Sequence, residues 1–249
     1  MSSPSVSALE NRPRVVAIVV AGFIGFLVGQ VVATLLEALG AALTSYPGGL
    51  SALTKVANPP WWANALGLLG VWTGFAAAIV FAYREGHLRP WPDQWRPRAS
   101  DAIYVVLGVA CQYLIDAAYY PFHFKSLNQP VNHLFAASHG GGFILVGLMT
   151  VFLAPLFEEW FFRGVLFRAL AEGTSGVTRP SAVVIGVVVS AALFGLAHGE
   201  PLEFAGLFVL GVVLAIVAYR SRRLVPSYLT HAAFNATAFV MVIHLRSGH

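Results

Sequence analysis

The chain has 249 residues, of which 57% are hydrophobic and only 10% are charged. A soluble globular protein has about 25% charged residues, so the composition excludes an ordinary soluble enzyme and a disordered chain. The single cysteine, Cys111, excludes a disulfide or a cysteine-only metal site within one chain. The net charge of +4 comes from basic residues scattered between apolar segments, whereas a nucleic-acid-binding surface gathers them on one face. The composition therefore indicates a lipid environment and no nucleic-acid partner.

Seven apolar segments are long enough to cross a membrane. A bilayer core of about 30 Å requires roughly 20 apolar residues in a helix. Turn-forming Gly, Pro and Asn residues occupy the connections between the segments. We therefore predict an all-α fold, a polytopic integral membrane helical bundle of about seven transmembrane helices. It forms a single domain over residues 15–246, behind a cytoplasmic tail at residues 1–14. The predicted spans are Val15–Leu39, Trp62–Tyr83, Ala102–Tyr120, Gly142–Leu170, Ala182–Ala197, Leu202–Tyr219 and Pro226–Leu245.

The positions of Lys and Arg predict the orientation of these spans. Counted connection by connection, 12 basic residues lie on one side of the membrane and 3 on the other, namely Lys55, Lys125 and Arg246. Cytoplasmic loops carry the excess of basic residues in multi-pass proteins. We therefore predict an integral cell membrane protein with its N-terminus in the cytoplasm and its C-terminus outside. Four tryptophans lie at predicted span ends, where an aromatic belt at the membrane surface is expected, namely Trp61, Trp62, Trp91 and Trp95.

Two adjacent acidic residues interrupt the fourth span. A charge at the centre of a bilayer costs at least about 2.5 kcal/mol, so Glu158 and Glu159 must be paired, solvated or used. Adjacent residues of a helix point about 100° apart, so the two carboxylates cannot share one role. Arg163 follows Glu159 by four residues, the spacing at which an acid and a base meet on one helix face. We predict a structural ion pair between Glu159 and Arg163, and Glu158 as the general base.

Further polar side chains interrupt two later spans. His198 ends the fifth segment, and His231 and Asn235 lie one turn apart on one face of the seventh. Any one of these groups is commonly a hydrogen-bonding residue between helices, but together with Glu158 they favour a catalytic site. A carboxylate that takes a proton from water, an imidazole that orients the water and donors facing an oxyanion are the components of amide hydrolysis. The sequence has no Gly-x-Ser-x-Gly motif, so water is the predicted nucleophile.

The same residues include a candidate metal site. Glu158, His198 and His231 make a set of two histidines and one carboxylate, which is a known ligand shell of catalytic zinc. The His-Glu-x-x-His motif of many zinc proteases is absent, so zinc is inferred from residue types alone. Metal-dependent and metal-free activation of water both remain open.

These motifs strongly resemble those of the CPBP intramembrane protease family, also called the CAAX protease and bacteriocin-processing or Abi family. The resemblance covers residues 142–239. It implies hydrolysis of a peptide bond in a membrane-associated protein or peptide, of the CaaX type or a related one. It also implies that Glu158 and His198 activate water, and that His231 and Asn235 stabilise the oxyanion. The motifs that carry the resemblance, with Phe194 in a supporting position, are Glu158-Glu159-x-x-x-Arg163, Phe194-x-x-x-His198 and His231-x-x-x-Asn235.

Two other functions remain open at this point. A non-catalytic membrane immunity or binding protein of the same fold would keep its activity after replacement of both Glu158 and His198. A proton-coupled transporter would also use intramembrane Glu and His residues, although the sequence lacks the internal repeats and paired broken helices typical of that class. For the protease, the expected partners are a membrane-associated peptide or protein substrate and the lipid bilayer.

Overall fold

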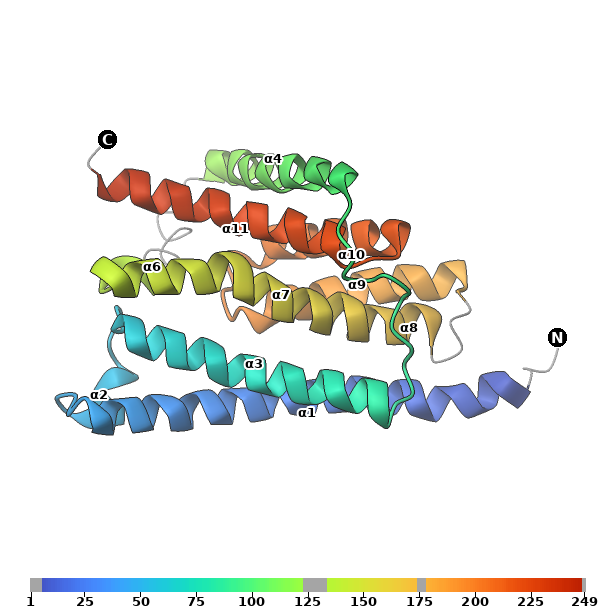
Figure 1. Ribbon diagram of the computed structural model, residues 1–249, viewed down its shortest axis with the longest axis horizontal. Coiled ribbons are helices and arrows are strands. Elements are labelled where there is room, and N and C mark those ends of the chain that lie inside the picture. The colour runs from blue at the N-terminus through green and yellow to red at the C-terminus, as the bar shows by residue number, and fades with distance from the viewer. Residues whose placement is uncertain (1–5, 123–133, 174–177, 248–249) are drawn as a thin grey trace. The chain divides into compact units, whose positions relative to one another are not determined.

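The structure is a computed structural model that describes residues 6–122, 134–173 and 178–247 (Figure 1). Within these residues all regular structure is helical, and seven spans are long and apolar enough to cross a membrane. The predicted all-α membrane fold is therefore confirmed, with span ends that differ by a few residues from those predicted. The spans are Arg14–Leu43, Trp61–Arg84, Ala99–Phe122, Gly140–Glu172, Pro180–Ala197, Phe204–Ser221 and Val225–Arg246.

Most spans consist of one long helix. Helix α1 begins at Val6, so it includes much of the segment predicted as an N-terminal tail. The short helix α2 (Gly49–Leu53) lies between the first two spans. The other helices that form single spans are α3 (Trp61–Arg84), α4 (Ala102–Tyr119), α9 (Pro180–Ala197), α10 (Phe204–Ser221) and α11 (Val225–Arg246).

The fourth span differs because its helical pitch changes along its length. π-Helical turns, in which each carbonyl pairs with the N–H five residues later, are rare and frequently lie at functional sites. Glu158 is the last residue of an α-helical turn, and Glu159 is the first residue of a π-helical segment. The acidic pair therefore sits at a change of pitch. In order, the span contains α6 (Gly140–Leu148), a π-helical turn (Met149–Leu153), α7 (Ala154–Glu158), a π-helical segment (Glu159–Phe167) and α8 (Arg168–Glu172).

The chain divides into two compact units, of which the first contains Met1–Phe26, Phe75–Asp101 and Phe157–Tyr228. In this unit α9 packs against both α8 and α10. A Cβ atom at Gly211 of α10 would lie 2.9 Å from the Cα atom of Ala191 in α9, so only glycine permits this approach. The buried core beside these helices consists of Trp91, Phe167, Ala171, Ala215, Ala218 and Leu224.

The connection between α3 and α4 is folded onto the first unit. Trp91 is 5% exposed, and its indole N–H donates to both carboxylate oxygens of Glu172 at 3.2 and 3.1 Å. Two nitrogens of Arg223 donate to the two carboxylate oxygens of Asp101 at 2.7 and 2.6 Å. The backbone N–H of Leu224 donates to the carbonyl of Gln94 at 2.7 Å. Trp91 therefore packs inside the protein and does not face lipid.

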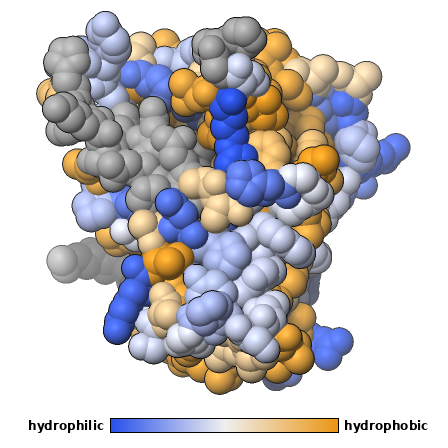
Figure 2. Space-filling model, turned by 90° about the vertical axis from the view of Figure 1, so that its left-hand side faces the viewer, coloured by the Kyte–Doolittle hydropathy of each residue, from blue (hydrophilic) through white to orange (hydrophobic). Residues whose placement is uncertain are grey.

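The second unit contains Leu27–Gly74, Ala102–Leu156 and Leu229–His249. Here α1 and α3 lie side by side, and a Cβ atom at Gly70 would be 2.2 Å from the Cα atom of Ala33. Small residues at such crossings are typical of membrane helices. Figure 2 shows the end of this unit at which α3 and α6 begin and α11 ends, with hydrophilic side chains gathered across it and hydrophobic ones along its edges. This distribution agrees with a helix bundle whose end meets water.

Candidate active site

A fully buried ion pair lies at the start of the second π-helical segment. The side chains of Glu159 and Arg163 are both 0% exposed, and Nη1 of Arg163 lies 2.8 Å from Oε1 of Glu159. Nη2 of Arg163 donates to the carbonyl of Gly211 at 3.1 Å, which ties the fourth span to α10. A buried charge is very costly unless it is neutralised. Glu159 therefore neutralises an arginine that water does not reach.

His198 directly follows α9, and the end of this helix orients its ring. Nδ1 of His198 lies 2.8 Å from the carbonyl oxygen of Phe194. The carbonyl of Phe194 is available to the ring because the backbone N–H of His198 donates to the carbonyl of Gly195 instead. A carbonyl only accepts hydrogen bonds, so Nδ1 carries the proton and Nε2 of the neutral ring keeps its lone pair. Because Phe194 and His198 are four residues apart, Nε2 of His198 is held as a hydrogen-bond acceptor at the end of α9.

The surroundings of His198 favour its neutral form. His198 is exposed, but the protein around the ring desolvates it and lowers the pKa of His198 below its ordinary value of 6.5. The positive charge of Arg163 lowers this pKa further, while the hydrogen bond to Phe194 and the charge of Glu200 act in the opposite direction. The ring is therefore mainly neutral at pH 7. Only the neutral ring can accept a hydrogen bond or a proton from water.

Phe194 connects the first two motifs. Its ring is 0% exposed and lies edge-on to Phe162 at 5.4 Å and to His198 at 4.8 Å between ring centroids. The guanidinium of Arg163 lies 4.5 Å from the centroid of the same ring, in a cation–π contact. Arg163 also interacts electrostatically with Glu158 and with His198. Glu158 is half-buried, with its Oε2 atom buried. The structure therefore brings the residues of both motifs together within the first unit.

The third motif belongs to the second unit and lies on α11. His231 is 2% exposed, and Asn235 is half-buried. Nδ2 of Asn235 donates to the carbonyl of Thr150 at 2.9 Å. In a π-helix the carbonyl of Thr150 would accept a hydrogen bond from the backbone N–H of residue 155, but Pro155 has no N–H. Asn235 therefore supplies the missing donor, and this bond orients its carboxamide, whose nitrogen carries a second hydrogen.

Several residues that position these side chains were not predicted from the sequence. A Cβ atom at Gly108 of α4 would lie 2.1 Å from the carbonyl oxygen of Thr230, next to His231, so α4 approaches α11 closely there. The carbonyls of Thr150 and Gly211 accept hydrogen bonds from site residues. Pro155 is the one sequence signal for this role of Thr150, because a proline within a helix always leaves a carbonyl without its donor.

The three predicted zinc ligands do not lie in one compact unit of the chain. Across residues 6–122, 134–173 and 178–247, no group of three or more His, Cys, Asp or Glu residues is placed to hold a metal ion. Glu158 and His198 belong to the first unit and His231 to the second. The hydrogen bond from Nδ1 of His198 to a carbonyl is the arrangement that commonly orients a zinc-binding imidazole. Zinc binding stays a prediction.

Comparisons with known proteins agree with the motifs. Residues 140–237, which include all three motifs, match the family model of the Rce1-like type II CAAX prenyl endopeptidases. The resemblance to the CPBP proteases is confirmed. The membrane-embedded CAAX protease MroQ of Staphylococcus aureus (strain USA300) is 31% identical over 93 residues, which are 37% of this chain and 36% of that protein. The match thus spans about a third of the curated relative's length. No solved structure matches the chain.

The chain carries a second acidic residue a few positions after the histidine of the second motif. Glu203 directly precedes α10, and desolvation followed by the charge of Glu200 raises the pKa of Glu203 from 4.5 to about 7. The folded protein therefore holds the proton on Glu203 more tightly than the unfolded chain does. The stability that Glu203 contributes is fully present below pH 4.5, the pKa in the unfolded chain, and is lost as the pH rises through about 7. We expect the unfolding midpoint in detergent to fall between about pH 5 and pH 8. Glu203→Gln should flatten this dependence, and equal slopes for both proteins would contradict the assignment.

Proposed function

We propose that the protein is an intramembrane endopeptidase that hydrolyses a peptide bond of a membrane-associated protein or peptide, of the CaaX type or a related one. The observation that carries the proposal is the packing of the motif of Glu158 and Arg163 against the motif of Phe194 and His198. The family match supports an endopeptidase acting at the membrane, and the name of the S. aureus relative supports a CaaX-type substrate.

In the proposed mechanism, water is the nucleophile. Glu158 accepts a proton from water while the water oxygen forms a bond to the carbonyl carbon of the scissile peptide. Nε2 of His198 accepts a hydrogen bond from the same water and orients its attack. The C–N bond then breaks, and Glu158 returns the proton to the leaving nitrogen. Glu158 acts once as a base and once as an acid, and the second hydrogen of the water stays on the new carboxyl group, so protons balance over the cycle.

The residues of α11 have a proposed role in stabilising the oxyanion. Asn235 is suited to this role because its bond to Thr150 fixes the carboxamide before substrate arrives. His231 is buried beside it on the same helix face. If Glu158, His198 and His231 held a zinc ion, it would be the alternative way to activate the water, because zinc would lower the pKa of a bound water molecule.

The test is a cleavage assay with the full chain reconstituted in liposomes. The substrates are farnesylated peptides that end in a CaaX sequence, together with unprenylated copies of the same peptides. We expect the wild type to release the residues after the prenylated cysteine. His198→Gln, which removes the imidazole that orients the attacking water, should slow this release by about 10²-fold or more. Mass spectrometry of the products measures the release by the wild type and by His198→Gln.

The same assay distinguishes the two ways of activating water. Loss of cleavage with a chelator, followed by recovery with added zinc, would establish metal dependence. Unchanged cleavage would establish the glutamate mechanism. If the wild type cleaves no membrane-anchored peptide and His198→Gln supports full cellular function, the protein is a binding or immunity protein instead.

A further inference from the structure

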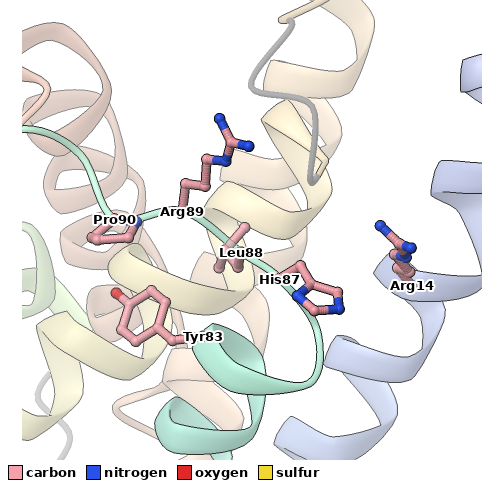
Figure 3. A pocket seen from close by; sticks show the side chains of 6 residues that line it. All are labelled: Arg14, Tyr83, His87, Leu88, Arg89 and Pro90. Carbon is pink, nitrogen blue, oxygen red and sulfur yellow. The ribbon is translucent and has the colours of Figure 1, made fainter.

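A basic cleft lies in the first unit, where α1 and α3 approach the connection that follows α3. Its volume is about 650 Å³. Figure 3 shows the side chain of His87 pointing toward Arg14 of α1, while Arg89 extends from the same connection. Within the part of the chain that the structure describes, none of the lining residues is acidic. The lining consists of Arg14, Tyr83, His87, Leu88, Arg89 and Pro90.

The backbone that forms the cleft is firmly held. The backbone N–H of Gly86 donates to the carbonyl of Phe81 at 3.0 Å, and that of Leu88 donates to Ala82 at 2.9 Å. The side chain of Leu88 is 2% exposed and anchors the connection in the protein. A Cβ atom at Gly86 would lie 2.6 Å from Cγ1 of Ile18, so glycine is required for the connection to reach α1. The cleft is therefore built into the fold and does not depend on a loose loop.

The conformation of His87 places another donor in this cleft. Its φ angle of 53° lies in the left-handed region, which residues other than glycine adopt uncommonly, with Asn, Asp and His enriched among those that do. The hydrogen bonds of Gly86 and Leu88 on either side hold this conformation. The Tyr83 hydroxyl oxygen accepts a hydrogen bond from Nε1 of Trp160 at 3.1 Å, so its own hydrogen is free to be donated to a ligand.

We propose that this cleft binds a phosphate group, carried either by the headgroup of an anionic membrane lipid or by a soluble phosphate ester. Arg14 and Arg89 supply guanidinium donors, whose planar geometry suits phosphate oxygens. His87 and Tyr83 add further donors. Arg14 is the first residue of one apolar span and Arg84 is the last of the next, so the cleft lies at the level of lipid headgroups. Basic pockets between membrane helices bind such headgroups on the cytoplasmic side, which is the side predicted here.

The test measures lipid binding to the full chain in neutral detergent micelles. Phosphatidylglycerol is titrated in, with phosphatidylcholine as the uncharged comparison, and native mass spectrometry counts the lipids retained. The variant Arg14→Gln/Arg89→Gln removes two charges from the cleft. The matched variant Arg84→Gln/Arg220→Gln removes two charges from exposed arginines that do not line it. All four side chains are exposed, and unchanged unfolding midpoints confirm that both variants fold.

We expect the cleft variant to bind phosphatidylglycerol roughly 25-fold more weakly than the wild type, at about fivefold for each basic side chain near the membrane surface. The matched variant should stay within about twofold. Glycerol 3-phosphate and inorganic phosphate are then added as competitors. Retention of the lipid against both assigns the site to lipid headgroups, and displacement assigns it to a soluble ester. Equal weakening in both variants, or no phosphatidylglycerol or phosphate binding by the wild type, would overturn the proposal.

Discussion

Glu158→Gln should abolish cleavage while the protein remains folded. An amide cannot take a proton from water, and a general base contributes about 10²–10⁴-fold to the rate, so kcat should fall by at least about 10²-fold. The side chain is half-buried and the glutamine has nearly the same shape. The unfolding midpoint should therefore stay close to that of the wild type. Product release from the farnesylated peptide gives kcat, and thermal unfolding in detergent gives stability.

Glu159→Gln is the matched control, because it makes the same chemical change one residue further along the helix. Glu159 is 0% exposed and neutralises Arg163. Its loss leaves a buried guanidinium without its counter-charge, which costs about 3–5 kcal/mol. We expect a much lower unfolding midpoint, with turnover retained by the molecules that remain folded. Near-normal turnover of Glu158→Gln, or wild-type stability of Glu159→Gln, would show that the two roles are wrongly assigned.

The spans were predictable because the bilayer imposes a simple rule. Every backbone polar group inside the membrane must be paired within its own helix, so a long apolar segment between turn-forming residues has few alternatives. The second span illustrates this, since Trp62–Tyr83 was predicted and Trp61–Arg84 is observed. The pairing of Glu159 with Arg163 was predictable for a similar reason. It depends on spacing along one helix, and the two side chains still meet within a π-helical segment.

Features that depend on distant partners were not predictable. Trp91 lies at a span end, which favours the membrane interface, but Glu172 accepts its indole hydrogen from 81 positions away. The change of pitch before Pro155 and the bond from Asn235 to Thr150 depend on two different spans. Neither the hydropathy of a segment nor the spacing of residues within it indicates which distant residues it will contact. The sequence therefore identifies the polar residues of a site more readily than the backbone groups that orient them.

Arg163→Met should be among the most destabilising single substitutions in the chain. It leaves the buried carboxylate of Glu159 without its cation and removes the hydrogen bond to Gly211 and the contact with the Phe194 ring. Removing one partner of a buried ion pair costs about 3–5 kcal/mol, whereas replacing both partners with neutral residues of similar volume is often nearly neutral. The double variant Glu159→Gln/Arg163→Met should therefore recover most of the lost stability, as measured by thermal unfolding.

The double variant also separates the structural role of Arg163 from its electrostatic effect on His198. The guanidinium lowers the pKa of His198, so its removal should raise this pKa and reduce the neutral fraction of the ring at a given acidic pH. The acid limb of the pH profile of kcat/KM should therefore move to higher pH, with cleavage retained at alkaline pH. A purely structural arginine would leave the profile of the stable double variant unchanged. A shifted limb would instead show that the buried ion pair tunes the group that orients the attacking water.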